Sequence, residues 1–218
     1  MITPSREDYL ETLFHLESEG VASTTQAIAD HLQISAASVS ENIKKMAIER
    51  FVVHSPYKGV KLTAKGRAVA IDVVRRHRLS ERFLVDKLGI KWEEAHREAH
   101  RLEHGLSRAV EVRMFELLGN PETCPHGNPV PTLSGKIRDD HSHPLASLNV
   151  HDRARIVKIT DEEPKQLRYL ASIGLMPKTQ IRVERKAPFG GAVIVRVGET
   201  AYALGNDIAR SIWVRKTG

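Results

Sequence analysis

The first sixty residues alternate between short amphipathic segments and a hairpin pattern, and this order constrains the fold more than any other feature of the chain. Apolar residues recur at helical spacing in 5–17, 24–34 and 37–51, with Ser5 and a threonine as candidate N-caps. Residues 51–63 then alternate around Pro-Tyr-Lys-Gly, which is typical of a β-hairpin. Helix, tight turn, helix and hairpin in this order predict a winged helix-turn-helix.

The second helix of the turn, with the hairpin after it, is the candidate DNA-reading surface. Small hydroxylated side chains in its first turns can reach base edges and phosphates in a major groove. Lysines of the helix and the wing can bind the phosphate backbone of the DNA. The alternative is a winged helix used only for protein contacts. The predicted DNA-binding residues are Ser35, Ala37, Ser38, Ser40, Lys44, Lys45, Tyr57 and Lys58.

The charge of the chain permits a polyanionic partner. The net charge is +6 and the pI about 9.5. Residues 1–64 carry 6 Lys and Arg against 8 Asp and Glu, residues 65–120 carry 12 against 9, and residues 121–218 carry 15 against 10. A DNA reader in the first segment therefore needs a locally basic surface. Its basic residues cluster after an acidic run, at Lys44, Lys45, Arg50, Lys58 and Lys61.

Cysteine usage and hydropathy indicate the compartment. The single Cys124 excludes an internal disulfide framework and fits a reducing cytosol. No apolar run approaches the length of a membrane span, and the N-terminus has no signal-peptide character. We therefore expect a cytoplasmic protein without a membrane partner.

The composition divides the chain into four segments, which together predict an α+β protein. Residues 1–64 form the winged helix-turn-helix. Residues 65–120 hold two long helices, at 65–89 and 92–119, with more apolar surface than they can hide, which predicts a homodimer. A two-fold dimer also suits palindromic DNA, whose half-sites lie about 34 Å apart.

The rest of the chain is predicted to be a linker and a small β domain. Residues 121–149 are rich in Pro and Gly and read as a linker whose first half is ordered. Residues 150–218 contain five short alternating segments and one helix, at 163–174, which predict a small SH3-like β-barrel. The predicted strands are 154–160, 179–186, 191–198, 200–205 and 211–216.

A stretch from His96 to Leu106 carries candidate metal ligands. At about 100° per residue, His96, His100, Glu103 and His104 share one helix face. The inner residues also match H-x-x-E-H, a pattern of one class of zinc peptidases.

Further acidic and histidine residues are open to two interpretations. Asp8 and Glu11, at i and i+3, face one side of the first helix, but such a pair also favours the helix dipole. His77, followed at i+4 by Glu81, is a candidate ligand, but by its spacing alone a solvated or capping histidine is the better interpretation.

The chain as a whole resembles the diphtheria toxin repressor family of metal-dependent repressors, which includes iron-dependent and manganese transport regulators. The motifs SREDYLETLFHLESEG, SAASVSENIKKM, KGVKLTAKG, RRHRLSERFL, AHRLEHGLS, CPHGNPVP and LASIGLMPKTQI occur in the family's order over nearly the whole length. Members bind a divalent metal, dimerise and repress metal-uptake genes, and many carry a C-terminal SH3-like domain. The resemblance implies a repressor that binds operator DNA as a homodimer and has neither enzymatic activity nor an organic substrate.

The resemblance also implies a primary metal cluster. Its positions match Asp8, Glu11, His77, His100, Glu103 and His104. Oxygen and nitrogen donors without sulfur suit Mn²⁺ or Fe²⁺. Iron-responsive members place methionine at Asp8 and cysteine at His100, whereas manganese-responsive members have aspartate at the first position, so the resemblance favours Mn²⁺, with Fe²⁺ as the alternative. His100 departs from both patterns. Zn²⁺ or Co²⁺ is expected to bind in vitro, following the Irving–Williams order.

Two ligand sets for a second metal site follow from the resemblance. The manganese type uses positions that match Glu81, Cys124, His126 and Asp161, and we prefer this set because Cys-Pro-His is intact. The alternative is an ordered turn with an incidental cysteine. The iron type uses positions that match His77, Glu81, His96, Glu163 and Gln166.

Three functions can be compared at this stage. A metal that joins the first helix to the dimerisation helices would act as a corepressor. An H-x-x-E-H peptidase needs an open coordination position, yet here the extra ligands fill the site. A regulator that senses a small organic ligand would leave the clustered ligands unexplained. We therefore predict a manganese-dependent repressor.

Overall fold

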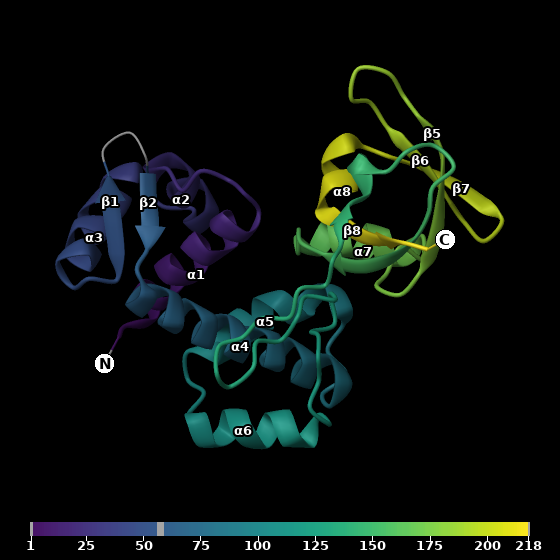
Figure 1. Ribbon diagram of the computed structural model, residues 1–218. Coiled ribbons are helices and arrows are strands. Elements are labelled where there is room, and N and C mark those ends of the chain that lie inside the picture. The colour runs from purple at the N-terminus through teal and green to yellow at the C-terminus, as the bar shows by residue number, and fades with distance from the viewer. Residues whose placement is uncertain (1, 56–58, 218) are drawn as a thin grey trace. The chain divides into compact units, whose positions relative to one another are not determined.

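The protein divides into two compact units, which are described separately (Figure 1). The computed structural model describes residues 2–55 and 59–217. The first unit is built from the chain up to His77, together with residues 103–106 and 131–136, and the second from the remainder. Among the described residues, we find no helix that has both the length and the hydropathy needed to cross a membrane.

The first unit has the predicted order of helices followed by a hairpin. Its elements are α1 (Pro4–Ser18), α2 (Thr25–Leu32), α3 (Ala36–Ile48), β1 (Val52–Ser55), β2 (Gly59–Leu62) and the start of α4 (Ala64–Asp86). Thr24 caps α2 by accepting from the amide of Ala27. The first helix differs slightly from the prediction: it begins at Pro4, one residue before the expected cap Ser5, because proline is well suited to the first helical turn.

The core of the first unit consists of the apolar stripes of these helices. The stripes lie at helical spacing on α1, α2 and α3, and the hairpin strands add inward-facing residues. The winged helix-turn-helix is therefore packed as its sequence pattern predicted. The fully buried members include Leu10, Leu13, Ile28, Val39, Ile43, Met46 and Val60.

The second unit contains the end of α4 and three helical segments. These are η1 (Trp92–Glu94), α5 (Ala95–Glu103) and α6 (Arg108–Leu117). The prediction of one long helix over 92–119 is wrong, since residues 104–107 separate α5 from α6. Gly105 favours a helix end, and the Ser107 hydroxyl accepts from the amide of Val110 at 3.4 Å, so a new helix begins there.

A six-stranded antiparallel sheet forms the rest of the second unit. The strand order is β3-β8-β4-β5-β6-β7, and all five predicted strands are present. Within the described residues the two end strands, β3 and β7, do not pair, so the sheet is open where a barrel was predicted. The strands are β3 (His143–Pro144), β4 (Arg153–Ile159), β5 (Gln180–Lys186), β6 (Val193–Val197), β7 (Thr200–Leu204) and β8 (Ile212–Lys216), and the helices are η2 (Leu145–Ser147), α7 (Pro164–Ser172) and α8 (Asn206–Ser211).

A tight loop at 123–129 packs against β4 by close backbone contact. The amide of Cys124 donates to the carbonyl of Asn128, and the amide of Ile159 donates to the carbonyl of His126, both at 2.9 Å. At Gly127 φ is +90°, and an added Cβ would lie 2.0 Å from the carbonyl oxygen of Val157. Only glycine permits this approach, which fixes two candidate metal ligands beside the sheet.

Candidate metal centres

The first unit brings carboxylates and imidazoles together from three segments of the chain. On α1, two carboxylates lie one turn apart; α4 contributes an imidazole; the end of α5 and the residue after it contribute a carboxylate and an imidazole. Most of these side chains are buried or nearly so. We call this group the first cluster: Asp8, Glu11, His77, Glu103 and His104.

Glu103 lies at the centre of the first cluster and is fully buried. Its carboxylate is 2.5 Å from Nδ1 of His77 and 3.3 Å from Nε2 of His104. Nε2 of His104 is also 2.9 Å from Oδ1 of Asp8. One donor atom each of Glu11, His77 and Glu103 lies within 4.8 Å of the other two.

The chemistry of the first cluster fits a divalent cation. Several carboxylates share a buried space, where uncompensated negative charge is costly. The donors are carboxylate oxygens and imidazole nitrogens, which suit a hard or borderline ion. His100, also predicted as a ligand, belongs to the second unit, where it is an exposed residue of α5.

Glu7 contacts His104 at Nδ1, the ring nitrogen that does not face Asp8 and Glu103 of the first cluster. Its Oε2 is 2.7 Å from Nδ1 of His104, and its Oε1 accepts from Arg76 at 2.8 Å. A carboxylate on Nδ1 fixes the ring and its tautomer, so that Nε2 is available on the cluster side. Glu7 was not among the predicted site residues, although its i, i+4 spacing to Glu11 places both on one helix face.

Replacing Glu7 with glutamine is expected to weaken metal binding by the first cluster about 10- to 100-fold, because the carboxylate of Glu7 holds the imidazole ring of His104 in its orientation. Competition against a fluorescent chelator measures this affinity. Glu17→Gln is the matched control, since Glu17 lies on the same helix and pairs with Arg67 at the surface. Equal metal affinity for the wild type and Glu7→Gln would contradict the role given to Glu7.

The second unit contains another group of metal-type donors. Glu81 comes from α4, His96 from α5, and Glu162 from the turn before α7; the tight loop adds a thiol and an imidazole. One donor atom each of Glu81, Cys124, His126 and Glu162 lies within 4.8 Å of the others. With His96, whose Nδ1 is 2.7 Å from Glu162, these residues form what we call the second cluster.

His126 is oriented for ligation by its backbone partner. Its Nε2 is 2.9 Å from the carbonyl oxygen of Trp92, so a proton placed there leaves Nδ1 facing the carboxylates. Nδ1 is 3.2 Å from Glu81 and 3.3 Å from Glu162. The indole of Trp92 packs on the imidazole, with ring centroids 5.0 Å apart.

The electrostatics of the second cluster favour a bound cation. Burial lowers the pKa of His126, but the Glu162 and Glu81 carboxylates outweigh burial and raise it well above 6.5. Burial, and then the charge of Glu81, raises the pKa of the Cys124 thiol to about 11. Two carboxylates and a thiol therefore share a buried space. Without a bound cation, protons on His126 and Cys124 limit its negative charge.

The acidic residue next to α7 that lies in the second cluster belongs to neither predicted set. Asp161 and Glu163 are exposed, and Oδ1 of Asp161 accepts from the amide of Glu163 at 3.1 Å. This Asx turn holds Asp161 at the start of the helix, while Glu162 lies in the cluster with Asn128 donating to it at 2.8 Å. Gln166 donates to Ser211 instead. The structure thus combines Cys124 and His126 of one set with His96 of the other and replaces Asp161 by Glu162.

The candidate recognition helix presents the predicted small polar residues. Ser35 caps α3 by accepting from the amide of Ser38 at 3.2 Å. Ser38 is half-buried, and the apolar side of α3 is in the core. Tyr57 and Lys58, predicted in the wing, lie outside the described residues. The exposed members of the predicted set are Ser35, Ala37, Ser40, Lys44 and Lys45.

A winged helix-turn-helix combined with buried carboxylate–imidazole clusters defines the class of metal-dependent DNA-binding regulators. Three family models match consecutive parts of the chain: the iron-dependent repressor N-terminal DNA-binding domain at 1–60, its metal-binding and dimerisation domain at 63–132, and the FeoA domain at 143–216. The chain belongs to the diphtheria toxin repressor family of metal-dependent transcriptional repressors.

Similar proteins extend over the whole chain. The iron-dependent repressor IdeR of Mycobacterium leprae is 34% identical, over 99% of this chain and 98% of the relative. The diphtheria toxin repressor of Corynebacterium efficiens is 32% identical, over 99% and 96%. A solved manganese-dependent transcriptional repressor in complex with manganese aligns with a TM-score of 0.92 and 34% identity, over 97% of this chain and 100% of that one. The family is not enzymatic, so the peptidase alternative is wrong.

Proposed function

We propose that this protein is a manganese-dependent repressor that binds palindromic operators of metal-uptake genes as a homodimer, with Mn²⁺ as corepressor. The observation that supports Mn²⁺ is the position of Asp8, whose carboxylate oxygen Oδ1 lies 2.9 Å from Nε2 of His104 in the first cluster. Oxygen and nitrogen donors suit Mn²⁺, whereas a thioether at this position would favour a softer ion. The similarity to a manganese-bound repressor supports the same choice.

The residues of the first cluster link its chemistry to the DNA reader. Asp8 and Glu11 belong to α1, which packs against α2 and β2 of the winged helix-turn-helix. Their carboxylates repel each other and also repel DNA phosphates. A bound divalent cation supplies two positive charges among them. Held toward His77 and Glu103, the two carboxylates keep α1 in one orientation, which lowers the cost of ordering the reader on DNA.

The second cluster is proposed as a second metal site, with Glu81, Cys124, His126 and Glu162 as ligands and His96 beside them. His100, the remaining family position, is proposed as a ligand contributed from α5. Fe²⁺ is the alternative physiological ion, because similar proteins include iron-dependent repressors.

Operator binding in the presence of different metals tests this proposal. A duplex is first selected from a random pool with Mn²⁺-loaded protein, and its binding is followed by fluorescence anisotropy. We expect Mn²⁺ to strengthen binding by metal-free protein about 5- to 150-fold, the usual range of coupling between two sites. Fe²⁺, added anaerobically, and Zn²⁺ are compared with it.

Asp8→Met is expected to shift the response from Mn²⁺ toward Fe²⁺, because a thioether replaces a hard oxygen donor. The ratio of the two half-activating metal concentrations measures the shift. Equal operator affinity in fully chelated and metal-loaded protein would overturn the proposal. An unchanged ratio would leave metal regulation intact and contradict the role of Asp8.

A further inference from the structure

The net positive charge of this repressor comes from its C-terminal part. Residues 150–218 carry 13 Lys and Arg against 7 Asp and Glu, while residues 1–149 carry 20 of each. The net charge of +6 is therefore that of the last 69 residues. Residues 1–64, which contain the DNA reader, are net negative, with 6 basic against 8 acidic residues. The segment that reads DNA is not the one that carries the charge complementary to DNA.

Three arginines of this segment stand side by side across the sheet. Arg153 on β4 is the register partner of Arg182 on β5, and Arg182 is the register partner of Arg196 on β6. Their neighbours Ala154, Ile181 and Val183 alternate with them, but this second set is buried. Because side chains alternate between the two faces of a sheet, the arginines lie on its outer face. We call Arg153, Arg182 and Arg196 the arginine row.

The arginine row is only partly neutralised. Arg196 pairs with Glu184, and Arg182 contacts a ring nitrogen of His151 at 3.4 Å. Over residues 2–55 and 59–217, no carboxylate forms an ion pair with Arg153. Like charges directly opposite each other destabilise a sheet, so the row is a cost to the fold that a ligand of opposite charge would offset.

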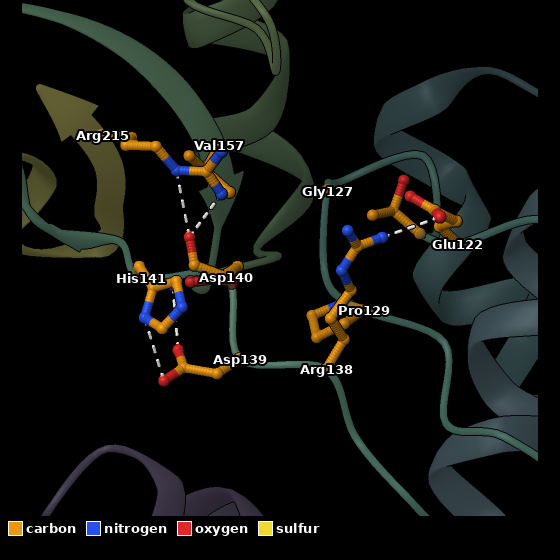
Figure 2. A pocket seen from close by; sticks show the side chains of 10 residues that line it. Glu122, Gly127, Pro129, Arg138, Asp139, Asp140, His141, Val157 and Arg215 are labelled. Atoms are coloured by element: carbon orange, nitrogen blue, oxygen red, sulfur yellow. Dashed lines mark hydrogen bonds and ion pairs between the residues drawn. The ribbon is translucent and has the colours of Figure 1, made fainter. Parts of the chain in front are cut away.

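A pocket of about 450 Å³ in the second unit does not explain the charge. Its polar groups satisfy one another: Arg138 pairs with Glu122, and Arg215 donates to the carbonyl of Asp140 (Figure 2). His141 likewise lies against Asp139. The arginine row is not among the residues that line this pocket: Arg153 and Arg182 are exposed, and Arg196 is half-buried.

We propose that the arginine row binds the phosphate backbone of double-stranded DNA without regard to sequence. Adjacent strands lie about 4.8 Å apart, so three arginines on three strands span roughly 10 Å. Guanidinium groups bind phosphate in a bidentate manner, and DNA carries about one negative charge per 1.7 Å of its axis. DNA is favoured over an acidic protein because the family already acts on DNA while residues 1–64 are net acidic. This inference does not depend on which metal activates the repressor.

The salt dependence of non-operator binding tests the proposal on the full-length protein. A fluorescent duplex without the operator is titrated between about 50 and 200 mM salt, with chelator and again with Mn²⁺. Each phosphate contact adds about 0.9 to the slope of log affinity against log salt. The triple variant Arg153→Gln, Arg182→Gln, Arg196→Gln should reduce the slope by about 2 to 3 for each protein chain whose six-stranded sheet contacts the duplex. For one sheet, the loss of affinity over this salt range should then be about 40-fold smaller than for the wild type.

A charge-matched variant separates the arginine row from net charge. Arg97→Gln, Arg101→Gln, Arg138→Gln removes the same charge from exposed arginines outside the row and should keep nearly the wild-type slope. The row variant should melt at the wild-type temperature or above it, because repulsion across the strands is relieved. Equal slopes for the row variant and the wild type would overturn the proposal.

A change in acidic-protein binding is the other result that would overturn it. If the row variant lost binding to poly-glutamate but kept wild-type affinity for the duplex, the partner would be an acidic protein. Loss of Mn²⁺-dependent operator binding is measured separately and bears only on the proposed function. The two proposals can therefore fail independently.

Discussion

Gly127→Ala is expected to destabilise the second unit and to dislodge the loop that carries Cys124 and His126. An added Cβ would lie 2.0 Å from the carbonyl oxygen of Val157 and 2.8 Å from Cα of Lys158. Both are backbone atoms of β4, so no side-chain rotation relieves the clash. With the left-handed φ added, we expect a loss of about 3 to 5 kcal/mol in the free energy of unfolding, measured by urea denaturation. The buried thiol of Cys124 should also react faster with a thiol reagent.

Gly174→Ala is the matched control for this substitution. Gly174 also has a left-handed φ, +74°, but no atom of another part of the described chain lies within 4 Å of where a Cβ would be. Only the conformational strain remains, and we expect a loss of about 1 kcal/mol with thiol reactivity unchanged. Equal losses for both substitutions would show that the close approach to β4 costs nothing, which would contradict the packing role of Gly127.

Local patterns in the sequence were sufficient to predict most elements of the fold. Alternation of apolar and polar residues predicted every strand from β4 to β8, because one face of each strand is buried against the core. The break between α5 and α6 was missed because apolar and charged residues keep helical spacing through it, and only Gly105 and Ser107 mark the end and the start. The two-residue strand β3 is too short to show a period. A barrel was predicted but the sheet is open, because closure requires the two end strands to pair over a long range, and a local sequence pattern does not specify such pairing.

The candidate clusters were predicted as far as their residues lie in recognisable motifs. Spacing on one helix face and the family resemblance together led to Glu103 and His104, which the structure places in the first cluster. Glu7 was missed because its function depends on a histidine 97 residues away. Asp161 was predicted from the family resemblance, and Glu162 was missed because nothing in the run of acidic residues 161–163 marks which of them faces the cluster.

Glu103→Gln is expected to remove most of the stabilisation that Mn²⁺ binding at the first cluster gives the protein. Glu103 is fully buried and lies against both His77 and His104, so its charge serves the whole first cluster. A ligand at 100 times its Kd adds about 2.7 kcal/mol to the free energy of unfolding. If the substitution weakens binding 100-fold, the same Mn²⁺ concentration adds only about 0.4 kcal/mol. Thermal melting with and without Mn²⁺ measures the difference.

The metal-free protein provides the decisive comparison for Glu103→Gln. The amide oxygen of glutamine can still accept from Nδ1 of His77, and one of several neighbouring negative charges is removed. The metal-free variant should therefore melt at the wild-type temperature or higher, which a merely disruptive substitution would not do. Glu98→Gln is the control on the same helix, because Glu98 pairs with Arg97 and Arg101 near the surface, and it should respond to Mn²⁺ as the wild type does. Full Mn²⁺ stabilisation of Glu103→Gln would mean that the stabilising ion does not bind at the first cluster, and the second cluster, which is unchanged in the variant, would then be the candidate site for it.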